Sequence, residues 1–277
     1  MAGGITQLII APHTPRIGVE AKAPDFQRGL IEGLRTLGAA LRGPEQRPDL
    51  IVINSTHWIT TFQWFVTCQA HHKGRVVAQE APDLIPGIPY SYAGDPDFAH
   101  ALVDEMERDG LAVGANETDD YVWDYGTWVP LQYMDPDGEI PVVAVGTVIM
   151  AGLDECLRAG GALRRAAETS GKKVAVLGST ALSHELVRGP ESWPTQARQD
   201  LDHRFIDLLT GGRIAEARRW LPEYARETVG EMGGRALAYA LGAFGTDPDG
   251  SWSGRQYGPY AQSSGSGNTS ILMSPVA

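Results

Sequence analysis

The stretch KKVAVLGSTALSH at residues 172–184 decides the fold. It carries a short apolar core, Val-Ala-Val-Leu-Gly, that is typical of a strand buried on both faces of a parallel sheet. Polar residues follow directly, beginning with Ser179 and ending with His184. In open α/β sheets, ligands bind outside the carboxyl ends of the strands. A polar run in this position therefore predicts a functional site at the strand C-terminal rim of a sheet.

The same alternation extends over most of the chain. Further buried strands are predicted at residues 5–11, 49–54, 63–68, 140–148 and 269–273. Helices are predicted at 25–42, 95–109 and 153–169, and helical periodicity with glycine breaks runs through 195–244. Residues 246–268 are rich in Gly and Ser and are predicted to form a loop. Strands that alternate with helices indicate an α/β protein with a central, mostly parallel sheet flanked by helices, and no linker divides residues 1–277 into more than one domain.

The composition excludes several classes of function as leading hypotheses. The 277 residues carry 23 basic and 34 acidic side chains, a formal net charge of −11, whereas nucleic-acid binding requires clustered Lys and Arg. The apolar run near the N-terminus is too short to cross a membrane or to act as a signal sequence. Cys68 and Cys156 have no metal-type spacing. We therefore expect a cytoplasmic protein with reduced thiols, no nucleic-acid partner and no membrane association.

Three of the seven histidines follow predicted strands. His13 comes after the first strand, His57 after the second, and His184 after the strand at 172–178. If these strands are parallel, the three imidazoles converge on one rim, which suits a metal site or acid/base chemistry. The other histidines are interpreted as structural: His71 and His72 in an exposed hairpin turn, and His100 and His203 on helices, the latter on a polar face.

Two histidines and one carboxylate form a metal site with three open positions. This arrangement suits non-heme Fe(II) that binds both an organic chelate and O2. Spacing alone does not select the carboxylate among 34 acidic residues. Glu231 is the preferred candidate because the adjacent glycines allow close backbone approach, whereas Glu185 directly follows His184 and is expected to point elsewhere.

Six motifs occur in a characteristic order. They are APHTP at 11–15, STHWIT at 55–60, DYGTWVPLQYM at 124–134, AVLGSTALSH at 175–184, LPEYA at 221–225 and SSGSGN at 263–268. Together they resemble the class III extradiol ring-cleavage dioxygenases of the protocatechuate 4,5-dioxygenase β-subunit type. The resemblance runs from about residue 5 to residue 273 and is strongest to the homoprotocatechuate 2,3-dioxygenase and 2-aminophenol 1,6-dioxygenase branches.

The resemblance implies a specific division of roles. The metal ligands of the family fall on His13, His57 and Glu231, the acid/base histidine falls on His184, and a substrate-contacting tyrosine falls on Tyr125. The implied activity is Fe(II)-dependent extradiol cleavage of a catechol-type or 2-aminophenol-type ring, with O2 as co-substrate and a muconic semialdehyde-type product.

Other residues are candidates for substrate contacts. Trp58 and Trp128 are candidates for an apolar wall against the ring, with ordinary packing as the alternative for both, and Tyr125 has a core tyrosine as its alternative. A carboxylated substrate would require a cation near the site, and the sequence does not rank Arg16, Arg188 and Arg255.

Two other functions remain open from the sequence. One is a catalytically silent partner subunit of a related heteromeric dioxygenase, although such a subunit would be expected to lose the histidines. The other is a zinc-dependent hydrolase on the same scaffold. The resemblance also implies an oligomer, composed of copies of this chain or of this chain with a related subunit.

Overall fold

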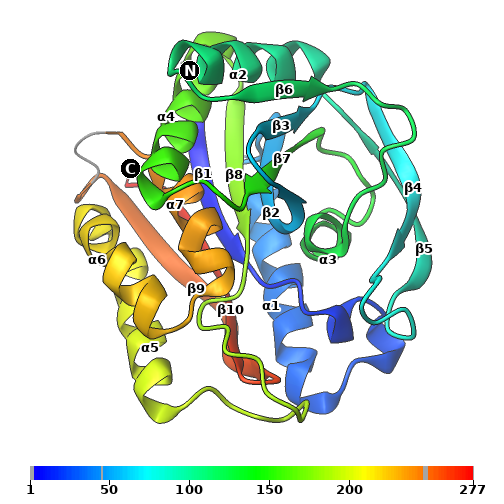
Figure 1. The fold of residues 1–277 in the computed structure, drawn as a ribbon, viewed down its shortest axis with the longest axis vertical. Coiled ribbons are helices and arrows are strands. Elements are labelled where there is room, and N and C mark those ends of the chain that lie inside the picture. Colours follow the sequence, from blue (N-terminus) through cyan, green and yellow to red (C-terminus); the bar gives the residue numbers. More distant parts are fainter. Residues whose placement is uncertain (1–2, 45, 246–248, 277) are drawn as a thin grey trace.

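The computed structural model describes residues 3–44, 46–245 and 249–276. An eight-stranded sheet with the order β6-β3-β7-β2-β8-β1-β10-β9 runs through the molecule (Figure 1). Its strands are β1 (Gly4–Ala11), β2 (Leu50–Thr60), β3 (Trp64–Thr67), β6 (Val113–Asn116), β7 (Val142–Val148), β8 (Lys173–Ser179), β9 (Trp252–Ser263) and β10 (Ser266–Pro275). A separate hairpin consists of β4 (His71–Val77) and β5 (Pro86–Ala93).

The centre of the sheet is parallel. Strand β8 pairs in parallel with both β1 and β2, and β2 pairs in parallel with β7. Antiparallel pairs lie toward the edges, where β10 joins β1 to β9 and β3 joins β7. The carboxyl ends of β1, β2 and β8 therefore meet at one rim, as the sequence predicts.

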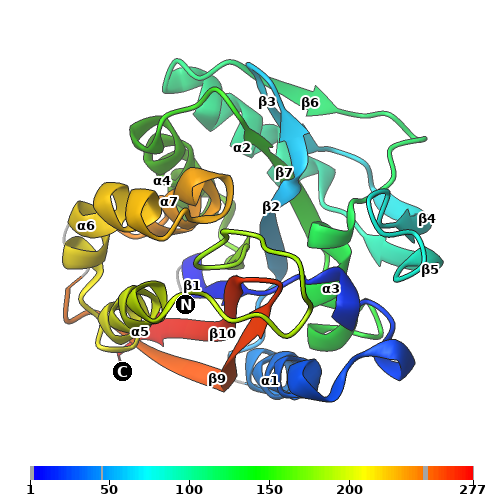
Figure 2. The ribbon, with the colours of Figure 1, turned by 60° about the horizontal axis from the view of Figure 1, so that its bottom comes forward.

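Helices cover both faces of the sheet, as two views show (Figures 1 and 2). One face packs on α1 (Asp25–Leu41) and α3 (Tyr125–Met134), and the other on α2 (Pro96–Arg108), α4 (Leu153–Ser170), α5 (Gln196–Thr210), α6 (Ile214–Glu227) and α7 (Arg235–Gly242). In β1, Ile9 and Ala11 pack in the core between the sheet and helices α1 and α3. Leu8 and Ile10 pack in the core on the opposite face. This alternation explains why residues 8–11 of the strand are all apolar.

The C-terminal region differs from the predicted loop over 246–268. Residues 246–248 lie outside the described part of the chain, but Trp252–Ser263 forms the edge strand β9, and β10 begins already at Ser266. Exposed and half-buried residues dominate the first nine residues of β9, so the strand lacks an apolar signature. Pairing with β10 stabilises it despite a composition that favours turns.

The predicted hairpin turn at residues 71–72 is also wrong. His71 and His72 begin strand β4, and His72 is buried, with its Nε2 3.0 Å from the carbonyl oxygen of Val142. Its ring also lies 5.1 Å from that of Trp123. The segment HHKGRVV has few apolar residues, and the imidazole of His72 takes a buried position that an apolar side chain usually occupies. The sequence therefore does not indicate a strand here.

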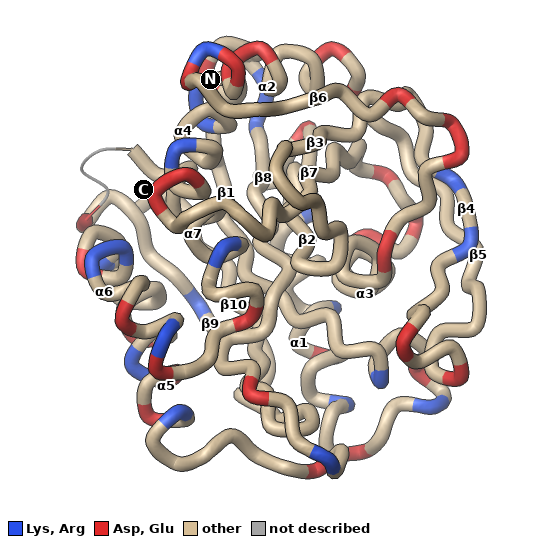
Figure 3. The backbone as a smooth tube through the Cα atoms, in the orientation of Figure 1, with Lys and Arg blue, Asp and Glu red and all other residues tan. Residues whose placement is uncertain are grey.

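Charged side chains are distributed over the helices. Lys and Arg positions alternate with Asp and Glu positions along α4, α5 and α6 (Figure 3). No helix within the described residues is both long and apolar enough to span a membrane.

Candidate metal centre and active site

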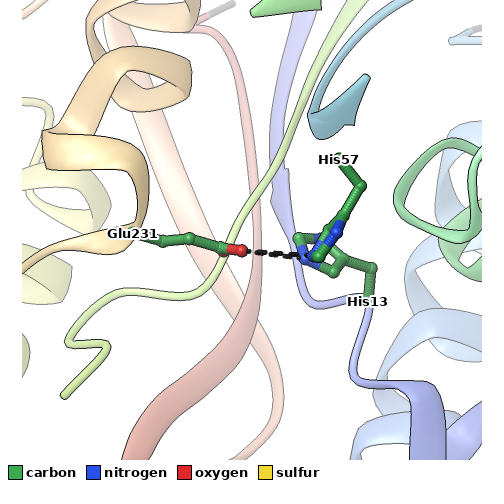
Figure 4. A group of neighbouring side chains, drawn as sticks. All are labelled: His13, His57 and Glu231. Carbon is green, nitrogen blue, oxygen red and sulfur yellow. Dashed lines mark hydrogen bonds and ion pairs between the residues drawn. The ribbon is translucent and has the colours of Figure 1, made fainter. Parts of the chain in front are cut away.

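Three segments far apart in the sequence bring His13, His57 and Glu231 together (Figure 4). His13 follows β1 by two residues, His57 lies within the extended end of β2, and Glu231 begins a short 3-10 helix at Glu231–Gly234. One ligand atom from each residue lies within 4.8 Å of those of the other two. Because β1 and β2 flank β8 in the parallel sheet, their carboxyl ends deliver both imidazoles to the same rim.

The backbone around Glu231 is unusual. Met232, Gly233 and Gly234 have φ values of 47°, 64° and 79°, a left-handed run that glycine tolerates best. This bend presents the Glu231 carboxylate to the rim, where its Oε2 accepts hydrogen bonds from the backbone N–H of Ala181 and, over 3.2 Å, from the hydroxyl of Thr180. The segment that follows β8 therefore holds the carboxylate in place.

The three residues shift one another's pKa values. Burial opposes ionisation of Glu231, but the neighbouring imidazoles, His13 first, outweigh it and hold the pKa of this carboxyl well below its usual range. Burial and repulsion from His13 lower the pKa of His57 to about 4. Burial also acts to lower the pKa of His13, but the Glu231 carboxylate overcomes it and raises that pKa. Metals are ligated by neutral imidazole and ionised carboxylate, so the shifts of His57 and Glu231 favour the ligating forms, whereas the shift of His13 reflects its ion pair with Glu231.

His184 lies next to this set. Its backbone forms an isolated bridge with Ser266, and its Nε2 lies 3.8 Å from Oε1 of Glu231. The preceding Ser183 points the opposite way, with its hydroxyl 2.7 Å from Asp202. Glu185 points away from the site and pairs with Arg198, as expected. The structure thus brings His184, but neither of its sequence neighbours, to the cluster.

Asp202 was not recognised in the sequence, where its helix face looks polar. The carboxylate is fully buried and accepts three hydroxyl hydrogen bonds. Its donors are Ser183 at 2.7 Å, Tyr224 at 2.7 Å and Tyr260 at 2.6 Å. This network ties α5, α6 and β9 to the residue beside His184. Only the tertiary structure reveals it, because the partners lie on separate elements.

The hydroxyl of Tyr125 lies beside His57, one of the three candidate metal ligands. The oxygen lies 2.7 Å from Nε2 of His57 and donates a 2.6 Å hydrogen bond to Glu80. Burial, followed by the Glu80 carboxylate, raises the pKa of this phenol. Gly126 permits the approach, since a Cβ there would lie 2.4 Å from the Ser55 hydroxyl and 3.3 Å from the His57 ring. Glu80 lies between β4 and β5 and carries no local motif, which explains why the sequence did not indicate it.

The two tryptophans occupy different environments. Trp58 packs against Tyr121, with ring centroids 4.7 Å apart and ring planes tilted by 38°, and both line a cavity of about 390 Å³ beside His57. Trp128 is only 4% exposed, lies in α3 and packs in the core, so the structure does not bring it to a cavity wall. Tyr125, at the start of the same helix, does line both cavities, whereas Trp128 lines neither of them.

A second cavity of about 270 Å³ opens directly onto the cluster. Besides His13, His57, Glu231, His184 and Tyr125, its lining includes the following residues: Thr14, Pro15, Arg16, Glu80, Leu84, Ala181, Leu186, Ser263, Ser264, Ser266 and Asn268. The cavity thus combines the metal-binding set, an imidazole outside that set, an apolar side and several polar groups. Such a combination is typical of a small-molecule site.

Comparison with known proteins identifies the class. Residues 7–269 match the model of the catalytic LigB subunit of aromatic ring-opening dioxygenase. The chain belongs to this family.

Individual relatives match over most of their length. The chain is 28% identical over 228 residues to 3,4-dihydroxyphenylacetate 2,3-dioxygenase of Escherichia coli, covering 80% of this chain and 82% of the relative. It is 29% identical over 258 residues to the 2-aminophenol 1,6-dioxygenase beta subunit of a Pseudomonas species, covering 86% and 84%. It is 23% identical over 242 residues to the alpha subunit of an enzyme with that name, covering 84% and 86%.

A solved structure shares the fold. The crystal structure of uncharacterized protein JW3007 from Escherichia coli K12 matches with a TM-score of 0.67 and 21% identity. The match covers 96% of this chain and 99% of that one. The similarity extends over the whole sheet and its helices, in agreement with the single α/β unit described above.

Proposed function

We propose that this chain is an Fe(II)-dependent extradiol dioxygenase that cleaves a catechol-type or 2-aminophenol-type ring with O2. The observation that carries the proposal is the convergence of His13, His57 and Glu231 on a cavity that also contains His184. Family membership supports the reaction class, and the names of two relatives support the two substrate types.

The residues fit an iron ion. Two imidazole nitrogens and one carboxylate oxygen form the donor set of the facial triad, which leaves open positions for a chelating substrate and for O2. His13, His57 and Glu231 would hold the ion. When bound, iron would lower the pKa of a ligated phenol and supply the one-electron chemistry that O2 requires.

The remaining residues handle protons and orientation. His184 takes a proton from the second hydroxyl or amino group of the substrate and returns it to oxygen as the ring opens, since an imidazole can do both near neutral pH. The raised pKa of Tyr125 keeps its phenol protonated, so the hydroxyl would donate a hydrogen bond to the substrate in exchange for its present one to Glu80. Leu84 and Leu186 give the cavity an apolar side against the ring.

Oxygen consumption tests this proposal. Protein reconstituted anaerobically with Fe(II) is mixed with air-saturated buffer and a panel of catechols and 2-aminophenols. We expect oxygen uptake, a yellow ring-opened product, and a mass increase over the substrate equal to one O2 molecule. If no member of the panel stimulates oxygen uptake by the iron-loaded protein, the proposal is wrong.

One alternative is a catalytically silent partner subunit, since two relatives are named as the alpha and beta subunits of a 2-aminophenol dioxygenase and a heteromeric assembly can divide roles between its chains. We expect about one iron per chain after reconstitution, whereas a silent subunit would retain none. A zinc-dependent hydrolase would bind metal without consuming oxygen. We further propose a cytoplasmic protein that forms an oligomer, of this chain alone or with a related subunit. Size measurement of the purified protein tests the oligomer, and fractionation of the producing cells tests the location.

A further inference from the structure

Arg16 lies at the wall of the metal cavity. It follows His13 by three residues and belongs to the short 3-10 helix Pro15–Ile17. Its side chain is half-buried and lines the cavity that contains the metal set. The turn that carries a metal ligand therefore also places a permanent positive charge beside the substrate space, because a guanidinium does not lose its proton in proteins.

The guanidinium of Arg16 has no hydrogen-bond or ion-pair partner among the described residues. Every other half-buried arginine in the described chain has one. These arginines are Arg35, Arg42, Arg164, Arg165, Arg198, Arg218 and Arg235, bound to carboxylates or backbone carbonyls. No Arg16 nitrogen is fully buried in the described structure, so this guanidinium stays open to the cavity with its donors available to an anionic ligand.

Glu80, the acidic residue of the cavity wall outside the candidate metal ligands, already has other partners and forms no ion pair with Arg16. Glu80 lines the same cavity, but its carboxylate accepts the 2.6 Å hydrogen bond from Tyr125 and lies 3.7 Å from Nδ1 of His57. Ser263 and Ser264 line the cavity as well and are neutral. Arg16 is therefore the one cation of the cavity wall, among the described residues, that lies outside the metal set and His184.

We propose that the substrate carries an anionic carboxylate substituent and that Arg16 binds it. This inference rests on the proposed ring-cleavage function and selects carboxylated rings over neutral ones. The structure also separates the three arginines that the sequence left unranked. Arg188 is exposed on the loop after His184, and Arg255 lies on β9 with its guanidinium 5.1 Å from the Tyr257 ring, and neither lines this cavity.

Ligand binding without turnover tests the assignment. The Fe(II)-loaded protein is titrated calorimetrically under anaerobic conditions with pairs of ligands that differ in charge. One pair is 3,4-dihydroxybenzoate and 3,4-dihydroxybenzamide, and the other is 3,4-dihydroxyphenylacetate and 3,4-dihydroxyphenylacetamide. We expect at least one acid to bind about 10-fold or more tightly than its amide. Arg16→Met should weaken that acid by about 10- to 100-fold, the range for loss of a charge-assisted hydrogen bond, and change the amide by less than about 2-fold.

Two further variants keep the test specific. Arg16→Lys retains the charge and should retain part of the preference for the acid, while Arg188→Met should leave both affinities unchanged. The assignment is overturned if the wild-type protein shows no preference for an acid, or if Arg16→Met weakens acid and amide equally. If the diols bind and are cleaved without such a preference, only the Arg16 assignment fails. If no diol binds, the ring-cleavage proposal fails together with it.

Discussion

The Nε2 atom of His13 lies 3.1 Å from Oε1 of Glu231, although 218 positions separate the two residues in the sequence. Both side chains are almost fully buried. A buried imidazole and carboxylate are stable together only when they compensate each other or share a cation. The fold therefore concentrates metal-binding chemistry at one point of the sheet rim, and the predictions below follow from that arrangement.

Removal of one ligand should abolish iron binding. We expect His13→Ala protein to retain less than about a tenth of the wild-type iron after anaerobic reconstitution and desalting, because two donors hold Fe(II) weakly. Metal analysis gives the answer directly. His100→Ala is the matched control, since His100 is half-exposed and pairs with Glu117 away from the cluster. Equal iron content in both variants would remove His13 from the ligand set.

His184 should affect turnover and not metal content. We expect His184→Phe to bind iron at the wild-type level and to lose about 10²- to 10⁴-fold in turnover, the usual effect of a positioned acid/base group. Steady-state oxygen uptake and metal analysis are measured on the same preparation. Full activity of this variant on every ring substrate would show that His184 is not the acid/base residue.

The Asp202 network should stabilise the segment that carries His184. We expect Tyr260→Phe to lower the free energy of unfolding by about 1.5–3 kcal/mol, because it removes a partly buried hydrogen bond to the buried Asp202 carboxylate. Urea denaturation measures this change. Tyr257→Phe, on the same strand but outside the network, should change stability by less than about 0.5 kcal/mol. Similar values for the two variants would contradict a stabilising network.

Protonation of His72 should lower the free energy of unfolding at acid pH. Burial lowers its pKa to about 4, below the value near 6.5 expected in the unfolded chain. The unfolded state then binds the extra proton between these two values, so the contribution of His72 to stability is complete above pH 6.5 and declines as the pH falls to about 4, by about 3 kcal/mol in total.

Comparison with His72→Gln isolates this effect. Gln preserves a donor for the Val142 carbonyl but does not titrate, so the variant should lose less stability than wild type between pH 6.5 and 4. The measurement is urea denaturation across this range, with the exposed His71→Gln as the control. Parallel pH profiles for wild type and His72→Gln would show that His72 titrates normally in the fold.

The sequence predicts the parts of this protein that depend on local pattern. Continuous apolar runs identify the central strands, since strands covered on both faces have no polar side. The strand ends then locate His13, His57 and His184. By contrast, β9 is an edge strand with an exposed, Gly-rich face, and only its pairing with β10 makes it regular. An edge strand of this kind carries no periodic signal.

The residues of the site also divide into those that a local sequence pattern indicates and those that only tertiary contacts bring together. Glu231 could be proposed because neighbouring glycines allow close backbone approach, and the family resemblance implied the same residue; the left-handed turn that these glycines form is visible only in the structure. Glu80 and Asp202 depend on contacts between elements that no local pattern specifies, so they emerge only from the structure. Trp128 shows the converse, since an aromatic residue three positions after Tyr125 on a buried helix packs into the core.

As an extradiol dioxygenase, this chain would insert both atoms of O2 into an aromatic ring and open it. The direct measurement is the mass of the product formed by Fe(II)-reconstituted protein under ¹⁸O2 with a carboxylated catechol. We expect one O2 consumed per ring and a ring-opened product that contains both labelled atoms until its new carbonyl oxygen exchanges with water. An intact ring, or no oxygen consumption by iron-loaded protein with any catechol or 2-aminophenol, would show that the chain is not a ring-cleaving dioxygenase.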